Sequence, residues 1–355
     1  MEAVAAKQNA QRGNRKIKCL VWDLDNTLWE GVLLEDSNVR LKDRAAEVIK
    51  ELDRRGILQS VASKNDYAAA IGKLKELGLS EYFLFPQINW NSKSSSISVI
   101  QESLNIGFDT FAFIDDQPFE REEVAFTYSD VLCLDANQLD TLLELPELMP
   151  DFVTEESQNR RLMYMSDYKR NTAEKEFEGP QEEFLATLGM VMRISPARSE
   201  DLQRAEELTL RTNQLNTTGY TYSFNELEAL SRSNRHKLLV ASLEDIYGTY
   251  GTIGLSLVEL DEEVWRLKLL LMSCRVMSRG VGSIMLQHLL QSAKQAGARF
   301  QAEFISNDRN RMMYITFKFA GFQEVASFGD GGVILENNFS QLGKFPDYVT
   351  VQVVE

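Results

Sequence analysis

Two carboxylates separated by one residue, Asp23 and Asp25, follow directly after an apolar run at residues 17–22. The run has the composition of a buried strand, so both side chains leave a sheet together and can meet one substrate. Two negative charges this close repel each other unless a cation lies between them or one carboxyl keeps its proton. The pair therefore predicts a bound cation or acid–base chemistry at the end of this strand.

Additional polar side chains follow the later strands of the predicted sheet, at the points where those strands are expected to end. Apolar runs at 57–62 and 111–114 alternate with amphipathic stretches of helical period, which predicts a parallel, doubly wound α/β sheet with right-handed crossovers. In such sheets ligands bind beyond the carboxyl ends of the strands. We expect a phosphoryl-transfer site at that edge, to which the chain brings Ser63, Lys64, Asn65, Lys93, Asp115 and Asp116.

This arrangement resembles the haloacid dehalogenase (HAD) superfamily of phosphatases and phosphotransferases. The resemblance implies that Asp23 is the nucleophile, which takes a phosphoryl group as an aspartyl phosphate. It implies that Asp25 is the general acid and base, which protonates the leaving oxygen and then activates water. Ser63 would hydrogen-bond the phosphoryl oxygens, and Lys93 would offset negative charge on the nucleophile and the phosphate.

The same resemblance implies Mg²⁺ as the cofactor. The ion would be held by Asp23, the backbone carbonyl of Asp25 and one carboxylate of the 115–116 pair. We favour Asp116 as the ligand and Asp115 as the group that orients Lys93. Oxygen ligands, few protein carboxylates and a phosphate partner suit Mg²⁺ better than zinc.

The spacing of these residues leaves no room for a separate cap domain. Asp23 and Ser63 are 40 positions apart, and Ser63 and Lys93 are 30 positions apart. We expect the first gap to hold a short flap at residues 29–36 and one helix, and the second gap to hold a helix and a strand. The mouth of a capless HAD-type domain is open, which is usual for phosphatases that act on macromolecules or use a second domain or a partner as a lid.

Length and composition predict two domains of ordinary size in the 355-residue chain. We expect a first domain at 16–150, a charged helical connector at 151–188 and a second domain at 189–355. The net charge of −15 argues against nucleic acid as a partner, and no apolar run approaches a membrane span. Three Cys without paired spacing indicate the reducing cytoplasm and argue against disulfides.

The second domain is expected to have α+β architecture. A turn at 276–283, between a strand at 264–272 and a helix from about Gly280, would present backbone N–H groups to an anion. Together with residues 307–314 it resembles the acetyltransferase (GNAT) fold, whose turn cradles the pyrophosphate of coenzyme A. Met277 stands where a Gln or Arg is usual, three positions before the first Gly, and this departs from the pattern of acetyl-CoA use.

Longer stretches in both halves resemble the FkbH-like family over about residues 16–325, namely Lys18–Trp29, Ser63–Asp66, Phe113–Arg121, Arg211–Asn216 and Leu271–Val276. FkbH-like proteins of polyketide pathways are glyceryl transferase/phosphatases. They take the glyceryl unit of 1,3-bisphosphoglycerate onto a cysteine thioester, remove the phosphate and pass the unit to the phosphopantetheine thiol of an acyl carrier protein.

This resemblance implies a phosphorylated three-carbon substrate and an acyl carrier protein as partner. The residues that it places against the substrate are Asn26, Thr27, Trp29, Lys64, Asn65, Arg211, Asn213, Cys274 and Arg275. We expect the second domain to cover the open mouth, with Arg211 or Arg275 binding a phosphate or carboxylate through paired hydrogen bonds.

One position departs from the family pattern. The family commonly has Cys immediately before Ser63, where this chain has Ala62, which cannot form a thioester. The chain is either an engineered Cys→Ala replacement or a natural variant, which could retain phosphatase activity, use another thiol or load the carrier thiol directly. Cys274 is the reserve thiol, because the adjacent Arg275 can lower its pKa; Cys19 and Cys133 lie in expected strands.

Two alternative functions stay open. The first is a Mg²⁺-dependent phosphatase that acts on a protein or on a carrier-bound phosphate, with the second domain as a lid or docking surface. The second is an acyl-CoA-dependent acyltransferase whose HAD domain is a degenerate scaffold. The intact set of acidic residues with Ser63 and Lys93 argues against the acyltransferase.

Overall fold

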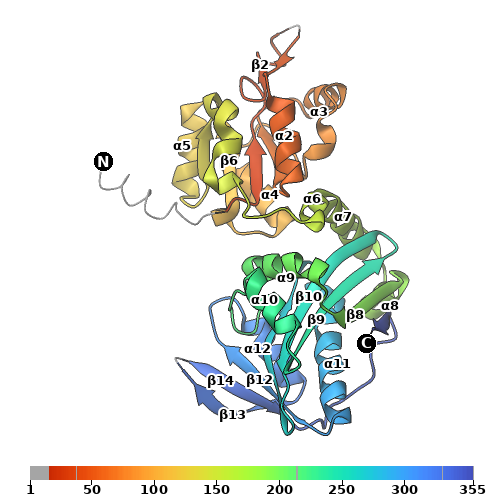
Figure 1. Ribbon diagram of the computed structural model, residues 1–355. Helices are drawn as coiled ribbons and strands as arrows, with labels where there is room; N and C mark the ends of the chain where they lie inside the picture. The colour runs from red at the N-terminus through yellow and green to blue at the C-terminus, as the bar shows by residue number, and fades with distance from the viewer. Residues whose placement is uncertain (1–15, 37, 213–214, 330, 355) are drawn as a thin grey trace. The chain divides into compact units, whose positions relative to one another are not determined.

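The computed structural model describes residues 16–354 apart from 37, 213–214 and 330, and it does not describe the side chains of Cys274 and Ser278. The chain forms two compact units, Met1–Met165 and Ser166–Glu355 (Figure 1). Their border lies within helix α7 (Arg160–Glu176), inside the segment that the sequence predicts as a connector. Among the described helices, none is both long enough and apolar enough to span a bilayer.

The first unit is built on a five-stranded sheet with the order β5-β4-β1-β6-β7. All four pairings between these strands are parallel, which confirms the predicted doubly wound sheet. The strands are β1 (Cys19–Trp22), β4 (Leu58–Ser63), β5 (Gln87–Ile88), β6 (Phe111–Asp115) and β7 (Leu132–Asp135). A parallel order places all five carboxyl ends at one edge of the sheet.

Helices cover both faces of this sheet, because successive side chains of a strand point to opposite faces. Leu20 and Trp22 of β1 pack in one core with helices α2 (Ala45–Arg54) and α3 (Tyr67–Glu76). Cys19 and Val21 pack in a second core with α4 (Lys93–Leu104) and α5 (Pro118–Thr127). The smaller elements of the unit are β2 (Trp29–Glu30), β3 (Arg40–Leu41), η2 (Ser80–Tyr82), η3 (Phe108–Thr110), η4 (Ala136–Glu144), η5 (Pro146–Leu148) and α6 (Glu155–Gln158).

The stretches between the expected site residues contain only small elements. The β2–β3 hairpin and α2 lie between β1 and β4, and α3, η2 and β5 lie between β4 and α4. The described part of these stretches therefore contains a short flap and no cap domain, as the spacing predicts.

The second unit is built on an eight-stranded mixed sheet with the order β13-β14-β12-β11-β10-β9-β8-β15. Its strands are β8 (Met190–Pro196), β9 (His236–Asp245), β10 (Gly248–Glu259), β11 (Val264–Met272), β12 (Arg299–Ile305), β13 (Phe322–Phe328), β14 (Gly332–Asn337) and β15 (Val349–Val353). Helices α9 (Ser199–Arg211) and α10 (Phe224–Ser231) pack on one face. The other face packs against α8 (Gln181–Thr187), α11 (Val281–Gln295) and α12 (Arg311–Phe319). This is the predicted α+β architecture.

Strands β11 and β12 pair only near their first residues, and beyond that point a segment of the chain lies between them. The Thr217 N–H donates to the Leu270 carbonyl at 3.1 Å, and the Ile305 N–H donates to the Thr217 carbonyl at 3.0 Å. Residues 215–217 thus bond to both strands. Because the segment already uses backbone groups on this stretch of β11, an extended ligand cannot pair with them there.

Candidate active site

Four of the expected site residues lie at the carboxyl edge of the first sheet, at the end of a strand or the start of a helix. Asp23 directly follows β1, and its N–H donates to the Ile114 carbonyl of β6 at 3.0 Å. Asp115 is the last residue of β6 and Asp116 is the next one. Lys93 is the first residue of α4, and Ser92 caps that helix by accepting a hydrogen bond from the Ser95 N–H.

Three carboxylates form a cluster at this edge. One oxygen from each of Asp23, Asp115 and Asp116 lies within 4.8 Å of the others. Burial raises the pKa of Asp115 to about 6, with the Lys93 charge opposing this effect and the Asp23 charge adding to it. Burial and the Asp23 charge also raise the pKa of Asp116. The raised pKa values show that these carboxylates need a nearby positive charge to be fully ionised. A cluster of oxygen ligands with this property fits Mg²⁺.

Lys93 joins two of these carboxylates to the end of β4. Its Nζ forms an ion pair with Asp23 Oδ1 and donates to the Ala62 carbonyl at 2.8 Å. It also lies 3.1 Å from Asp115 Oδ2, the ion pair that the sequence predicts. Burial lowers the pKa of Lys93, but the charges of Asp23 and Asp115 outweigh burial and raise the pKa above its usual value. The ammonium therefore stays charged beside Asp23.

The Asp25 carboxylate is held by three donors. Trp29 Nε1 donates to Oδ1 at 2.8 Å, the Leu33 N–H donates to Oδ1 at 3.0 Å, and Asn65 Nδ2 donates to Oδ2 at 2.9 Å. Burial raises the pKa of Asp25, while the hydrogen bonds from Leu33 and Trp29 lower it. A raised pKa suits a group that must first give and then take a proton. Trp29 and Asn65, expected against the substrate, thus position Asp25.

Three other expected residues also have partners at this edge. The Thr27 hydroxyl accepts from the Asp116 N–H at 3.0 Å, so it ties the loop after β1 to the loop after β6. Asn26 adopts a left-handed conformation with a φ of 53°, and its side chain accepts from the Gly31 N–H at the start of the flap. Lys64 pairs with Glu120 at 2.7 Å.

The Leu33 N–H and Glu120 were missed by the sequence reasoning. A backbone donor leaves no trace in a sequence. Glu120 lies within the Phe113–Arg121 stretch, and an acidic residue on an expected helix does not by itself indicate a partner. Ser63 lies at the end of β4 and is buried.

Ala62 lies on β4 beside the site and is completely buried. Its side chain belongs to the core that contains Ile97 and Phe113, whereas its carbonyl accepts the hydrogen bond from Lys93. A sulfur atom at this position would lie next to the charged end of α4 but inside packed side chains. Residue 62 itself therefore offers no thiol or other nucleophilic side chain.

The expected binding residues of the second unit are held within that unit. Arg211 pairs with Glu207, with 3.5 Å between Nε and Oε1. Arg275 Nη2 donates to the Tyr250 carbonyl at 2.9 Å, whereas its Nη1 is buried and has no hydrogen-bond partner. Asn213 and the side chain of Cys274 lie outside the described residues, so these two expectations stay predictions.

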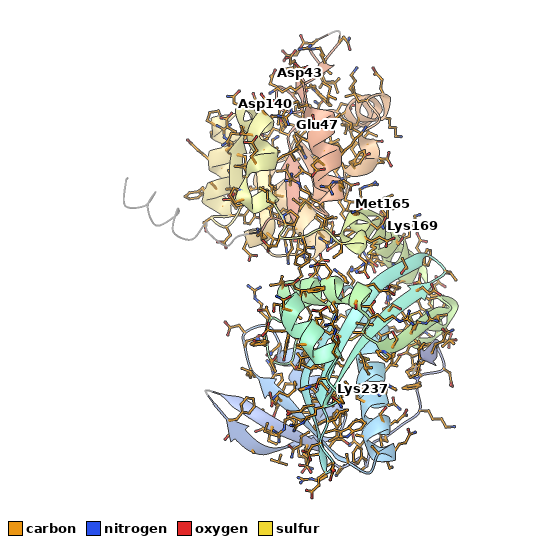
Figure 2. The ribbon with its side chains drawn as sticks, in the orientation of Figure 1. Asp43, Glu47, Asp140, Met165, Lys169 and Lys237 are labelled. Carbon is orange, nitrogen blue, oxygen red and sulfur yellow. The ribbon has the colours of Figure 1, made fainter. Side chains whose placement is uncertain are left out.

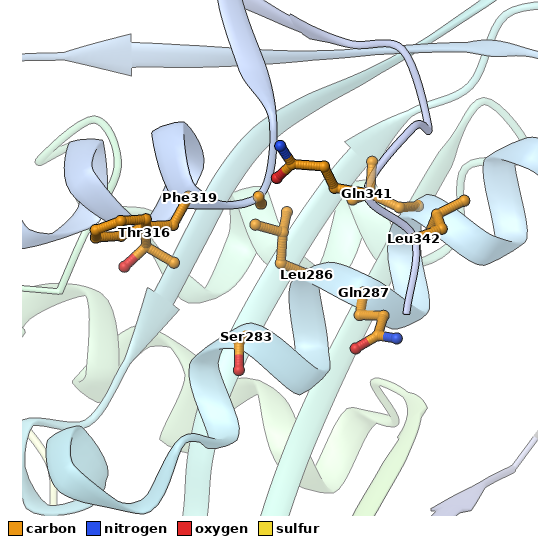
Figure 3. A pocket seen from close by; sticks show the side chains of 9 residues that line it. Ser283, Leu286, Gln287, Thr316, Phe319, Gln341 and Leu342 are labelled. Carbon is orange, nitrogen blue, oxygen red and sulfur yellow. The ribbon is translucent and has the colours of Figure 1, made fainter. Parts of the chain in front are cut away.

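The turn before α11 lies where the sequence predicts it, between β11 and the helix. The segment η6 (Cys274–Arg279) leads to Gly280, whose φ of 71° favours glycine, and α11 begins at the next residue. A pocket of about 360 Å³ lies between α11, α12 and residues 341–342 (Figure 3). Ser283, Gln287, Thr316 and Gln341 are its polar lining residues, and none of its described lining residues is charged. No side-chain cation in this lining would meet a pyrophosphate.

Comparisons with known proteins find similarity to solved structures. No protein-family model and no curated protein matches the chain. Among solved structures, the N-terminal part of BF1531 from Bacteroides fragilis, which contains a phosphatase domain complexed with Mg, is 34% identical over 41% of this chain and 42% of that chain, with a TM-score of 0.33. The chain therefore spans less than half of that structure.

Two further similar structures are N-acetyltransferase-type domains. The ribosomal-protein-S18-alanine N-acetyltransferase from Escherichia coli is 16% identical over 43% of this chain and 97% of that chain, with a TM-score of 0.34. The GNAT domain of S. lividans PAT is 21% identical over 40% of this chain and 88% of that chain, with a TM-score of 0.33. Because these TM-scores are low, the fold and the site rest on the topology and contacts described above.

Proposed function

We propose that the first unit is a Mg²⁺-dependent phosphatase that forms a phosphoryl-enzyme at Asp23. The observation that carries this proposal is the position of Lys93 Nζ, which contacts both Asp23 and Asp115 beside a three-carboxylate cluster. A buried carboxylate with a fixed ammonium on one side is oriented for attack on phosphorus. Asp23, Asp116 and the backbone carbonyl of Asp25 would hold the Mg²⁺ ion.

The residues at this edge suit two successive reactions. Asp23 forms a bond to phosphorus while the bond to the leaving oxygen breaks, and Asp25 gives its proton to that oxygen. Asp25 then takes a proton from water, which attacks the phosphoryl group, breaks the bond to Asp23 and releases inorganic phosphate. Lys93 offsets the negative charge throughout, and Ser63 can donate to a phosphoryl oxygen. When bound, Mg²⁺ neutralises charge on the phosphoryl oxygens.

The substrate in this proposal is a phosphorylated three-carbon unit derived from 1,3-bisphosphoglycerate, and the partner is an acyl carrier protein. The support for both is the set of stretches that resemble the FkbH-like family. With Ala62 in place of Cys, the phosphopantetheine thiol of the carrier attacks the acyl phosphate directly. A carbon–sulfur bond forms, the bond to phosphate breaks, and the remaining phosphate ester is then hydrolysed at Asp23.

A second candidate is a phosphatase that acts on a protein or on a carrier that is already loaded with a phosphorylated group. The identity of residue 62 favours it, because Ala62 offers no thiol at the end of β4. The small β2–β3 flap is compatible with either macromolecular substrate.

Incubation with an acyl carrier protein and 1,3-bisphosphoglycerate, followed by intact-mass measurement, distinguishes these functions. The leading proposal predicts a glyceryl mass on the carrier, and in the Asp23→Asn variant a phosphoglyceryl mass instead. Asp66→Asn is the matched control, because Asp66 caps α3 and Asn can replace it as a cap. Phosphate release from a preloaded carrier without loading indicates the second candidate. Consumption of acetyl-CoA with no phosphate release contradicts both.

A further inference from the structure

A second cavity of the second unit lies beside the C-terminal half of α11, away from the turn that precedes this helix. It has a volume of about 460 Å³ and is formed by β8, β9, α11 and residues 353–354. This volume is in the range of small-molecule sites. Ile194, Leu239 and Val354 provide apolar walls, and Lys237 and His288 contribute ionisable groups.

The polar groups of this cavity occur on faces that are apolar elsewhere. Lys237 precedes Leu239 by two residues on β9, so it lies on the face of the sheet that packs against α11. Figure 2 labels Lys237 in this unit. On α11, the polar lining residues His288, Gln291, Ser292 and Gln295 follow one another at helical spacing. A strand and a helix thus turn polar side chains toward one cavity.

Two of these groups have no partner in the described part of the chain. His288 is only 9% exposed as a residue, yet among the described residues no hydrogen bond or ion pair involves its ring. Lys237 has no ion pair either, although Asp and Glu outnumber Lys and Arg by 53 to 38 in the chain. Largely buried polar groups such as the His288 ring are normally paired, so this unpartnered imidazole, in one cavity with the unpaired ammonium of the half-buried Lys237, indicates a binding site.

The charge of the lining specifies the kind of ligand. None of the ten lining residues is Asp or Glu, and Lys237 is the one Lys or Arg among them. Burial, and then the Lys237 charge, lower the pKa of His288, so the imidazole is neutral at pH 7 and can donate one hydrogen bond. One ammonium balances one negative charge, and the apolar walls leave room for a hydrocarbon body.

We propose that this cavity binds a small organic monocarboxylate. The Lys237 ammonium pairs with the carboxylate, the His288 ring donates a hydrogen bond to it, and the hydrocarbon part packs against Ile194, Leu239 and Val354. The site is separate from the carboxylate cluster of the first unit, and it does not depend on the function proposed there.

The test uses hexanoate as the probe, with acetate and inorganic phosphate for comparison, and the full-length protein. The chain has two histidines, so labelled imidazole signals are readily assigned with a His236→Gln variant. Hexanoate should shift the His288 signals and raise the pKa of this ring, because a nearby negative charge favours the imidazolium. Acetate should bind at least about tenfold more weakly, because it buries less apolar surface.

Two lysine variants make the test specific. Lys237→Gln should weaken hexanoate binding by at least about tenfold, as expected when a charge-assisted hydrogen bond to the carboxylate is lost. Lys294→Gln is the matched control, since Lys294 is exposed on α11, the helix that carries His288, and does not line the cavity. Thermal unfolding followed by circular dichroism verifies that each variant is folded, and Lys237→Met, which keeps the His288 signals as the readout, provides a second variant if Lys237→Gln is not.

Three results would overturn the proposal. The first is the absence of any His288 shift with hexanoate up to about 10 mM, well above the dissociation constant of a specific small-molecule site. The second is equal binding by the wild type and the Lys237→Gln variant. The third is a shift with phosphate but not with hexanoate, which would show an inorganic-anion site instead.

Discussion

Replacing Trp29 by Phe separates the two proton transfers assigned to Asp25. The change removes the indole N–H that donates to Asp25 Oδ1 at 2.8 Å and keeps an aromatic ring in the core. The donors from Leu33 and Asn65 stay in place. The loss of a hydrogen-bond donor destabilises the charged form of a carboxylate, so the pKa of Asp25 should rise further.

The expected effect falls on the second reaction. A hydrogen bond to a charged group contributes about 1.5–3 kcal/mol, which corresponds to about ten- to a hundredfold in rate. Protonated Asp25 can still act as the acid, but it cannot take a proton from water. At neutral pH the hydrolysis of the phosphoryl-enzyme should therefore slow by about this factor, and phosphoryl-Asp23 should accumulate. Higher pH should restore the rate, because Asp25 then ionises.

Quenched-flow kinetics with p-nitrophenyl phosphate and Mg²⁺, from about pH 6 to 9, measure both steps. Nitrophenol release reports the first step, and acid-trapped phosphoprotein, detected by intact mass, reports the second. Trp90→Phe is the matched control, because Trp90 follows β5 at the same edge and is 70% exposed. If both steps slow equally at every pH and no phosphoprotein accumulates, Trp29 does not act through the basicity of Asp25.

Chelation should abolish phosphate release and Mg²⁺ should restore it, whereas zinc as the best activator would contradict an all-oxygen site. In metal-free protein, the folded-state pKa of Asp115, about 6, lies above its ordinary value of 3.8, so the folded state binds more protons between these values. The free energy of unfolding should therefore fall as pH rises from about 4 to 6. Urea titrations at several pH values should show a smaller decrease of this free energy with pH in Asp115→Asn. Arg170 forms a buried paired contact with Asp245, at 2.7 and 2.9 Å. Arg170→Met should destabilise the second unit by about 3–5 kcal/mol in urea titrations, because Asp245 is left unpaired, whereas the exposed neighbour Lys169→Met should change little.

The sequence by itself determined the scaffold of the site. The apolar runs at 17–22, 57–62 and 111–114 became β1, β4 and β6, with ends that differ by one or two residues. Local pattern is sufficient here, because a parallel sheet buries its central strands on both faces and its carboxyl ends lie at one edge. The polar residues that follow each strand were therefore predictable neighbours.

Tertiary structure decided which of those neighbours touch. Asn65 was expected against the substrate, but it donates to Asp25, a residue 40 positions earlier. Residues 215–217 occupy the gap between β11 and β12, and Lys237 meets His288 in one cavity. Sequence periodicity shows which face of an element is polar. Which faces meet, and at what distance, depends on how the elements pack, and hydrogen bonds form only within about 3 Å.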